Sequence, residues 1–174
     1  GMVLLEALNI SEGRGTTIPF ELFGAPFTDA DRLIKKLEGK KIPGCRFRRH
    51  DFIPVFNKYR NDLCRGVQIH VTDPLHFHPV GTAMEIIDAI IETSPAGSVE
   101  FRPPPYEYEE KLMPFDILSG DRGMREGLLG RKDPAIEMER WKEEIEKFAL
   151  EFRGISAYPY SKRPSSRSSS RIAD

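Results

Sequence analysis

The chain has 174 residues, 39% of them hydrophobic, so it is long enough for one domain with a packed core and too short for two ordinary domains. Its 26 Lys and Arg residues nearly balance its 27 Asp and Glu residues, and a net charge of −1 gives no global attraction to nucleic acid or to an anionic membrane. Two cysteines, Cys45 and Cys64, make no disulfide framework and lack zinc-site spacing, so we interpret them as partly buried free thiols. No apolar run reaches the roughly 18 residues of a membrane span.

The first elements are short. Residues 11–17 contain two glycines and predict a loop, and the apolar stretch 20–23 predicts a strand. Thr28 has the side chain of an N-cap, and the apolar positions of residues 30–37 fall on one helical face. Gly39 is expected to end this helix.

The middle of the chain mixes extended and helical patterns. Residues 45–56 are rich in aromatic side chains and predict extended chain, and the strict alternation over 67–72 predicts a half-buried strand. Pro79 can begin a second helix. Residues 102–114 hold four prolines and predict a loop, and 115–129 predict short helical turns. Together these elements predict an α+β fold, a small mixed sheet with flanking helices.

The last helix has the strongest pattern. Asp133 is a suitable N-cap and Pro134 a suitable first residue, and Gly154 is expected to end the helix. Apolar side chains then repeat at three and four residues, which predicts one buried stripe: Met138, Trp141, Ile145, Phe148 and Phe152. Residues 161–174 are rich in Ser and Arg and predict a disordered tail.

The most unusual segment is Asn-Ile-Ser-Glu-Gly-Arg-Gly-Thr-Thr at residues 9–17. Two glycines around an arginine permit a backbone path that other residues resist, and the arginine offers a planar fork suited to a carboxylate. The candidate positions are Glu12, Arg14, Gly15, Thr16 and Thr17. The alternative is a turn in which Glu12 and Arg14 only neutralise each other, and composition alone favours that alternative. No Gly-Lys-Ser/Thr follows, so the segment is not a P-loop, and we expect no cofactor.

Other polar residues are weaker candidates. Glu21 is either a buried structural carboxylate bonded to backbone N–H groups or a site residue. His70 shares a strand face with Gln68, and Asp73 ends that strand, so this face is either a saccharide-binding surface or the solvent side. The His-x-His pair at 76–78 has no supporting ligand cluster, so we predict no metal site.

The run NISEGRGTT-x-PFELFGAPF at residues 9–27 resembles the signature of the exo-β-N-acetylmuramidase (NamZ-like) family, long catalogued as a domain of unknown function. Further blocks match the family in the same order: CRGVQIHVTD at 64–73, FHPV at 77–80 and FDILSG at 115–120. The resemblance covers residues 2–160, and its first block is long enough to be specific.

The resemblance implies a two-domain enzyme with a Rossmann-like N-terminal domain, a smaller α+β domain and a cleft between them. Residues 1–160 would be the C-terminal domain, with the N-terminal domain absent from this chain. Such an enzyme removes a non-reducing-end N-acetylmuramic acid from peptidoglycan fragments. We expect the isolated chain to be inactive and to expose an apolar patch where the first domain would sit. Export of the parent protein would fit the role, although this chain begins without a signal peptide.

Within that resemblance, Glu12 is expected to contribute one of the two carboxyl groups that glycoside hydrolysis usually needs. Arg14 is expected to bind the lactyl carboxylate of N-acetylmuramic acid, together with the hydroxyls of Thr16 and Thr17. The remaining candidates for substrate binding are Gly15, Glu21, His70 and Asp73, and the presence of His70 in the family block at 64–73 favours a functional role for it. The alternative functions are a non-catalytic peptidoglycan-binding module and a module that only docks its partner domain. The expected partners are muramyl saccharides and the absent N-terminal domain.

Overall fold

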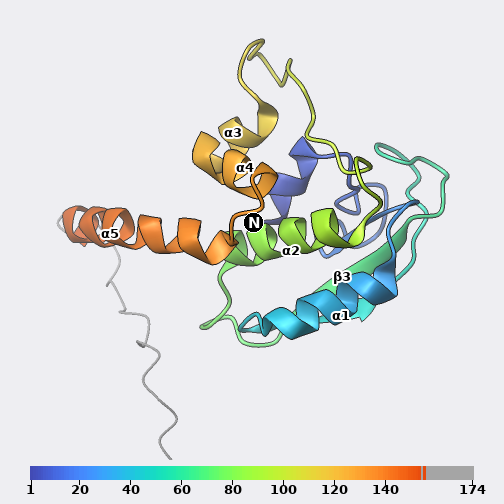
Figure 1. The fold of residues 1–174 in the computed structure, drawn as a ribbon, viewed down its shortest axis with the longest axis horizontal. Coiled ribbons are helices and arrows are strands. Elements are labelled where there is room, and N and C mark those ends of the chain that lie inside the picture. The colour runs from blue at the N-terminus through green and yellow to red at the C-terminus, as the bar shows by residue number, and fades with distance from the viewer. Residues whose placement is uncertain (154, 156–174) are drawn as a thin grey trace, which may run out of the picture. The chain divides into compact units, whose positions relative to one another are not determined.

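The computed structural model describes residues 1–153 and residue 155. In chain order, the elements are η1 (Met2–Ala7), β1 (Leu22–Ala25), α1 (Ala30–Lys40), β2 (Cys45–Arg49), β3 (Arg65–Val71), α2 (Pro79–Thr93), α3 (Pro114–Ser119), α4 (Arg122–Leu129) and α5 (Pro134–Arg153), as Figure 1 shows. A first compact unit ends at Glu139 and a second begins at Arg140. The predicted helix stop at Gly154 and the predicted tail at 161–174 lie outside the described residues.

The α+β class is confirmed, but the sheet is antiparallel rather than mixed. Its strand order is β1-β3-β2, and β3 runs antiparallel to both neighbours. The β1-α1-β2 crossover does create two strands of the same direction, and β3 then inserts between them. Gln68 of β3 therefore lies opposite Leu22 on one side and Arg48 on the other.

Helix α1 forms where the periodicity predicted it, but its ends differ by one or two residues. The N-cap is Asp29, whose carboxylate accepts from the Arg32 N–H, because the Thr28 hydroxyl is already used by the Ala25 N–H at 3.0 Å. Gly39 lies within the helix, and Lys41 closes it in the left-handed conformation. A terminal charged residue thus takes the position that glycine usually fills.

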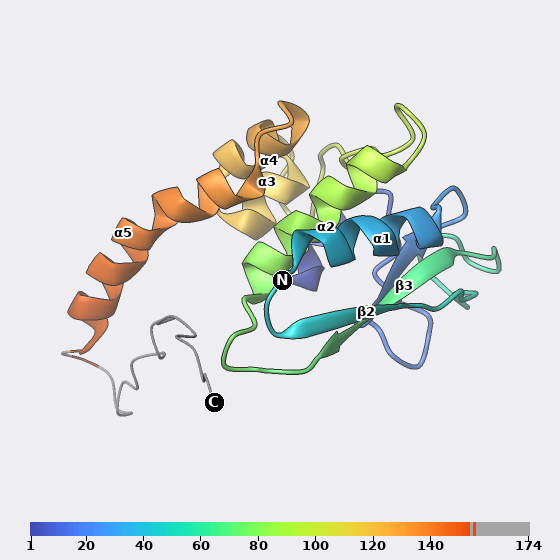
Figure 2. The same ribbon diagram turned by 60° about the horizontal axis from the view of Figure 1, so that its bottom comes forward.

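Helix α2 is the centre of the first unit. It begins at Pro79 as predicted and has buried residues on most of its circumference, which is typical of a core helix. It packs against α1 and η1, and α3 packs on η1 in turn. Figure 2 shows α1 and α2 on the same side of the sheet. The largest fully buried side chains come from all these layers, and they include Leu5, Phe23, Leu33, Ile87 and Phe115.

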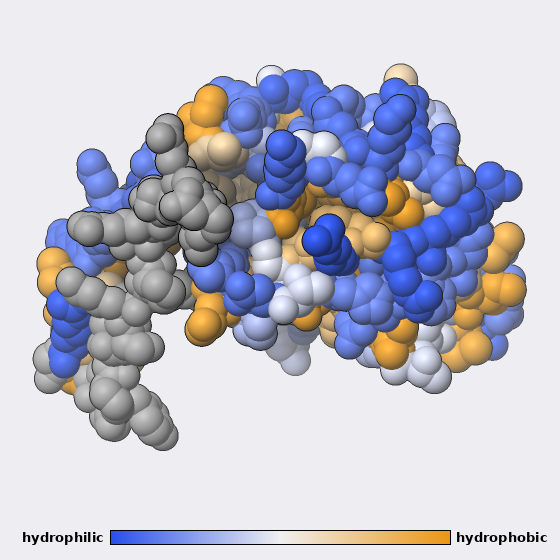
Figure 3. Space-filling model, turned by 90° about the horizontal axis from the view of Figure 1, so that it is seen from below, coloured by the Kyte–Doolittle hydropathy of each residue, from blue (hydrophilic) through white to orange (hydrophobic). Residues whose placement is uncertain are grey.

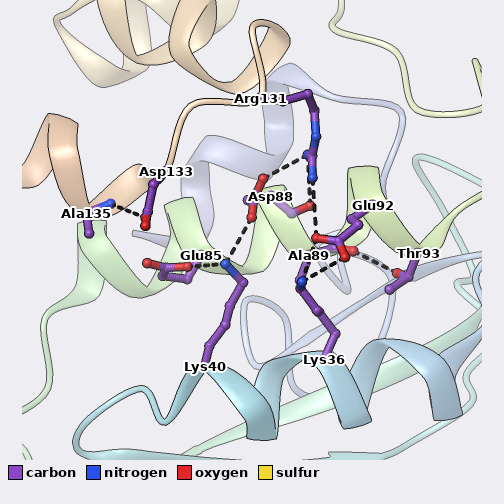
Figure 4. Close-up of polar contacts among 10 residues, drawn as sticks. All are labelled: Lys36, Lys40, Glu85, Asp88, Ala89, Glu92, Thr93, Arg131, Asp133 and Ala135. Carbon is purple, nitrogen blue, oxygen red and sulfur yellow. Dashed lines mark hydrogen bonds and ion pairs between the residues drawn. The ribbon is translucent and has the colours of Figure 1, made fainter.

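A charged network joins α1 to α2 (Figure 4). Asp88, which is 7% exposed, accepts from Lys40 at 2.9 Å and from Arg131 at 2.8 Å. Lys36 pairs with the more exposed Glu92 at 2.7 Å. Arg131 also reaches Glu92, at 3.4 Å, so the two acids differ in burial and not in the number of their partners. Because the Asp88 side chain is 10% exposed and that of Glu92 41%, solvent screens the Asp88 contact less.

Helix α5 starts at Pro134 as predicted, and Asp133 caps it by accepting from the Ala135 N–H at 2.9 Å. The prediction of a buried apolar stripe is wrong. Ile145 is 57% exposed, Phe148 65% and Phe152 41%. Among the described residues, the second unit holds no element other than α5. The apolar stripe of α5 therefore has no second layer within that unit to cover it.

The structure also describes the two cysteines and the polarity of the surface. Cys45 is half-buried and Cys64 buried, and both are free, as predicted. The face of the molecule in Figure 3 is mostly hydrophilic, with hydrophobic residues in separate groups between the polar ones. No described helix is both long enough and apolar enough to cross a membrane.

Candidate functional site

The loop at residues 9–17 connects η1 to β1. Ser11 anchors it to the sheet edge, because its N–H donates to the Gly24 carbonyl at 2.9 Å and its carbonyl accepts from the Gly24 N–H at 3.1 Å. Gly13 and Gly15 have φ values of +78° and +84°, in the left-handed region. The prediction that both glycines permit an unusual backbone path is therefore confirmed.

Gly15 also allows a close approach between two loops. Its carbonyl accepts from the Val55 N–H at 2.9 Å, and a Cβ at this position would lie 2.6 Å from the Phe56 carbonyl oxygen. Thr16 turns inward, since its hydroxyl donates to the Gly13 carbonyl at 2.7 Å, whereas Thr17 is exposed. Thr17 is therefore the more exposed of the two threonines, and Thr16 is half-buried.

Glu12 lies beneath this loop, with its side chain 2% exposed. One carboxylate oxygen accepts from Lys58 Nζ at 2.9 Å, and the other lies 3.2 Å from Arg14 Nε. Lys58 also donates to the carbonyls of Leu5 and Ile10, at 2.8 and 2.9 Å. Burial lowers the pKa of Lys58, and Glu12 opposes that shift. This buried pair holds the loop, η1 and the 57–59 turn together.

Arg14 covers the buried pair. Its Nη2 donates to the Glu6 carboxylate, its Nε faces Glu12, and its guanidinium lies 5.0 Å from the centroid of the Phe20 ring. The second Glu6 oxygen accepts from the Tyr106 hydroxyl at 3.3 Å. The Arg14 side chain is 39% exposed, and its Nη1 has no acceptor among the residues that the structure describes. The arginine is thus oriented by two carboxylates with one donor nitrogen left over.

A second polar group occupies one face of the sheet. Gln68, 6% exposed, accepts from Arg48 at 2.8 and 3.0 Å and donates to Glu21 at 3.3 Å. Arg48 Nε also lies 3.2 Å from His70 Nε2. His70 and Gln68 share this face, as predicted. Glu21 is exposed and bonds a side chain, so the alternative of a buried carboxylate tied to backbone N–H groups is wrong.

Asp73 belongs to a local turn. Its carboxylate accepts from the Leu75 N–H at 3.0 Å and pairs with His76 at 2.6 Å, and both partners are within three residues of it. No group of three or more His, Cys, Asp or Glu side chains arranged for a metal ion occurs among the described residues. The contacts of the described residues therefore form three separate groups, in the 9–17 loop, on the sheet face and in this turn.

Four charged side chains, Glu6, Glu12, Arg14 and Lys58, form what we call the loop cluster. Reasoning from the sequence missed two of them, Glu6 and Lys58. Glu6 was detectable in principle, because a lone carboxylate inside the apolar stretch Met2–Ala7 needs a partner when buried. Lys58 gave no signal, since it sits in a polar loop and reaches its partner 46 positions away. Only the fold brings these residues together.

The loop cluster can orient a donor more readily than it can release a proton. Two cations, Arg14 and Lys58, face the carboxylates of Glu6 and Glu12, so the charges balance. Both oxygens of Glu12 already accept from cations. What remains accessible is the outer edge of Arg14 and the hydroxyl of Thr17, both of which suit a carboxylate or a saccharide hydroxyl.

Comparison with known proteins shows the family to which this chain belongs. Residues 1–158 match the family model described as exo-β-N-acetylmuramidase NamZ, C-terminal. The chain belongs to the NamZ C-terminal domain family. It is 47% identical over 92 residues to the peptidoglycan β-N-acetylmuramidase NamZ of Bacillus subtilis (strain 168), a match that covers 53% of this chain and 22% of that protein.

Two solved structures share the NamZ C-terminal fold. One DUF1343 family protein from Bacteroides fragilis superimposes with a TM-score of 0.75 over 90% of this chain, at 22% identity, and a second with 0.59 over 91%, at 21% identity. This chain covers 40% and 39% of those two chains. The relatives are thus much longer than the segment they share with this protein.

Proposed function

We propose that this domain closes one side of the active-site cleft of an enzyme that removes non-reducing-end N-acetylmuramic acid from peptidoglycan fragments. The name of the Bacillus subtilis relative and the family model support the substrate class. The observation that carries the proposal is the buried Glu12–Lys58 pair beneath Arg14, which orients one guanidinium edge outward.

Each loop residue then has a role in this proposal. Arg14 binds the lactyl carboxylate through its outer edge, and Thr17 adds a hydroxyl, while Thr16 and Gly15 fix the loop. Glu12 contributes a carboxylate to the site as a charge partner, because both of its oxygens already face cations. Glu21, His70 and Asp73 contribute from neighbouring surfaces. The second carboxyl group that the reaction usually needs would come from the rest of the protein.

The proposal also assigns the parts of the polypeptide. Residues 1–160 would belong to the C-terminal domain, and a Rossmann-like domain would complete the enzyme. An apolar surface beside the 9–17 loop supports docking of that domain: Ile53 is 55% exposed, Val55 65% and Phe56 56%. Exposed apolar side chains that adjoin a polar site commonly mark an interface.

A second candidate is a peptidoglycan-binding module without turnover. The observation in its favour is the burial of Glu12, which holds its carboxylate away from solvent in this domain. Both candidates use Arg14 for recognition, so they differ in the fate of the bound saccharide rather than in the contact.

The test is Arg14→Lys and Arg14→Gln in the full-length protein, with hydrolysis of a chromogenic β-N-acetylmuramic acid glycoside as the assay. Lysine keeps the charge but loses the fork, so kcat/KM should fall at least about tenfold in both variants. Arg122→Gln is the control, because Arg122 is exposed on α4 and pairs only with Glu126 among the described residues. Unchanged kcat/KM in Arg14→Lys would exclude the proposed role of Arg14.

A further inference from the structure

A pocket of about 510 Å³ has Lys58, the cation of the buried pair, among its lining residues. Part of its lining comes from segments that hydrogen-bond to each other: the Arg102 N–H donates to the Ala7 carbonyl at 2.7 Å, and the Asn9 N–H donates to the Glu100 carbonyl at 3.0 Å. The 57–59 turn also lines the pocket, and the Tyr59 hydroxyl donates to the Asn9 carbonyl at 2.5 Å.

The volume and lining suit a small polar ligand. Pockets of roughly 300–1,000 Å³ with apolar walls and a few polar groups are typical ligand sites. Here Tyr59 and Phe101 supply aromatic carbon, and Asn57 and Glu100 supply acceptors for hydroxyl groups. A monosaccharide presents that combination of apolar faces and hydroxyls.

One cation of the lining is available to the carboxylate of an acidic ligand. The cations of the lining are Lys58 and Arg102, and its one carboxylate is Glu100. Lys58 already holds Glu12, whereas Arg102 is exposed and has no carboxylate partner among the described residues. Its guanidinium lies over the Tyr106 ring, 5.8 Å from the centroid, which orients it without occupying its N–H donors.

We propose that this pocket binds a second sugar acid of monosaccharide size, separate from the sugar whose carboxylate Arg14 binds, with Arg102 as the contact for its carboxylate. The ligand class rests on the proposed function, in which a muramyl saccharide is the substrate. Lys58 connects the pocket to the loop cluster, because this residue lines the pocket and its ammonium donates to Glu12. A saccharide bound here would therefore contact the residue that fixes the Arg14 loop.

The experiment measures binding of two sugars to this chain by calorimetry. N-acetylmuramic acid and N-acetylglucosamine share the sugar ring and the N-acetyl group, and they differ in the lactyl carboxylate. The wild-type chain should bind the muramic acid more tightly, and Arg102→Gln should weaken that binding at least about tenfold while leaving the glucosamine unchanged. Arg122→Gln should bind both sugars as the wild type does.

A third variant separates this proposal from the role of Arg14. Loss of the preference in Arg14→Gln but not in Arg102→Gln would overturn the pocket proposal and leave the proposed function intact. Equal binding of the two sugars by the wild-type chain, or no binding, would also overturn it. Arg102-dependent binding combined with an inactive full-length enzyme would support the pocket and contradict the hydrolase function. Thermal melts of each variant verify that it folds.

Discussion

Replacing Lys58 by Met tests whether the buried ion pair holds the 9–17 loop in place. Methionine keeps most of the aliphatic stem but removes three hydrogen bonds, to Glu12, Leu5 and Ile10. Glu12, at 2% exposure, would keep only the 3.2 Å contact to Arg14. Breaking a buried pair by removing one partner costs about 3–5 kcal/mol.

The lower end of that range applies here, because the Lys58 side chain is 20% exposed and its charge is not fully desolvated. A loss of about 3 kcal/mol, at about 2–4 °C per kcal/mol in a chain of this size, lowers Tm by about 6–12 °C. The assay is thermal unfolding followed by circular dichroism. Lys35→Met is the matched control, since Lys35 is exposed on α1 and should change stability by less than about 0.5 kcal/mol.

The double variant Glu12→Gln with Lys58→Met then isolates the pair. If the destabilisation comes from an unpaired buried carboxylate, the double variant should be more stable than the sum of the two single changes predicts. Free-energy changes of the two single variants that were additive in the double variant would refute the reasoning. A Lys58→Met variant with the same Tm as Lys35→Met would also refute it.

Three further predictions concern the loop, the buried thiol and the helix network. Gly15→Ala should destabilise by about 1–3 kcal/mol in urea unfolding, because φ is +84° and a Cβ would lie 2.6 Å from a carbonyl oxygen, whereas Gly39→Ala, within α1 and with open space around it, should stabilise by about 0.5–1 kcal/mol. Burial raises the pKa of Cys64 from 9.0 to about 11, so this thiol ionises at a lower pH in the unfolded chain than in the folded one. The free energy of unfolding should therefore fall between pH 9 and pH 11, by up to about 1.4 kcal/mol per pH unit. Cys64→Ala should abolish this contribution to the pH dependence. Asp88→Ala should cost about 1–3 kcal/mol because it removes a buried carboxylate that bonds two cations, and it leaves Lys40 with Glu85 and Arg131 with Glu92. Glu92→Ala, at 41% exposure, should cost less than about 1 kcal/mol, and equal losses would contradict the burial argument.

Local features of this protein were predictable from sequence because their causes are local. The helix at Pro79, the start of α5 at Pro134 and the two left-handed glycines follow from proline, capping and glycine chemistry. The alternation in β3 likewise fixed which residues face the same side.

Features set by distant contacts were not predictable. The insertion of β3 between β1 and β2 makes the sheet antiparallel, and no residue pattern specifies that order. Lys58 joins Glu12 only through a fold that brings two loops together. The stripe of α5 has a core-like period, but a period cannot show whether a second layer is present to cover it.

The most direct test of the proposed function compares this chain with the same chain joined to the Rossmann-like domain that we propose for the whole enzyme. The substrate is the chromogenic β-N-acetylmuramic acid glycoside. We predict no hydrolysis by the isolated chain, hydrolysis by the joined protein, and loss of that hydrolysis in Glu12→Gln. Hydrolysis by the isolated chain, or full activity of the joined protein with Glu12→Gln, would contradict a split cleft in which Glu12 takes part.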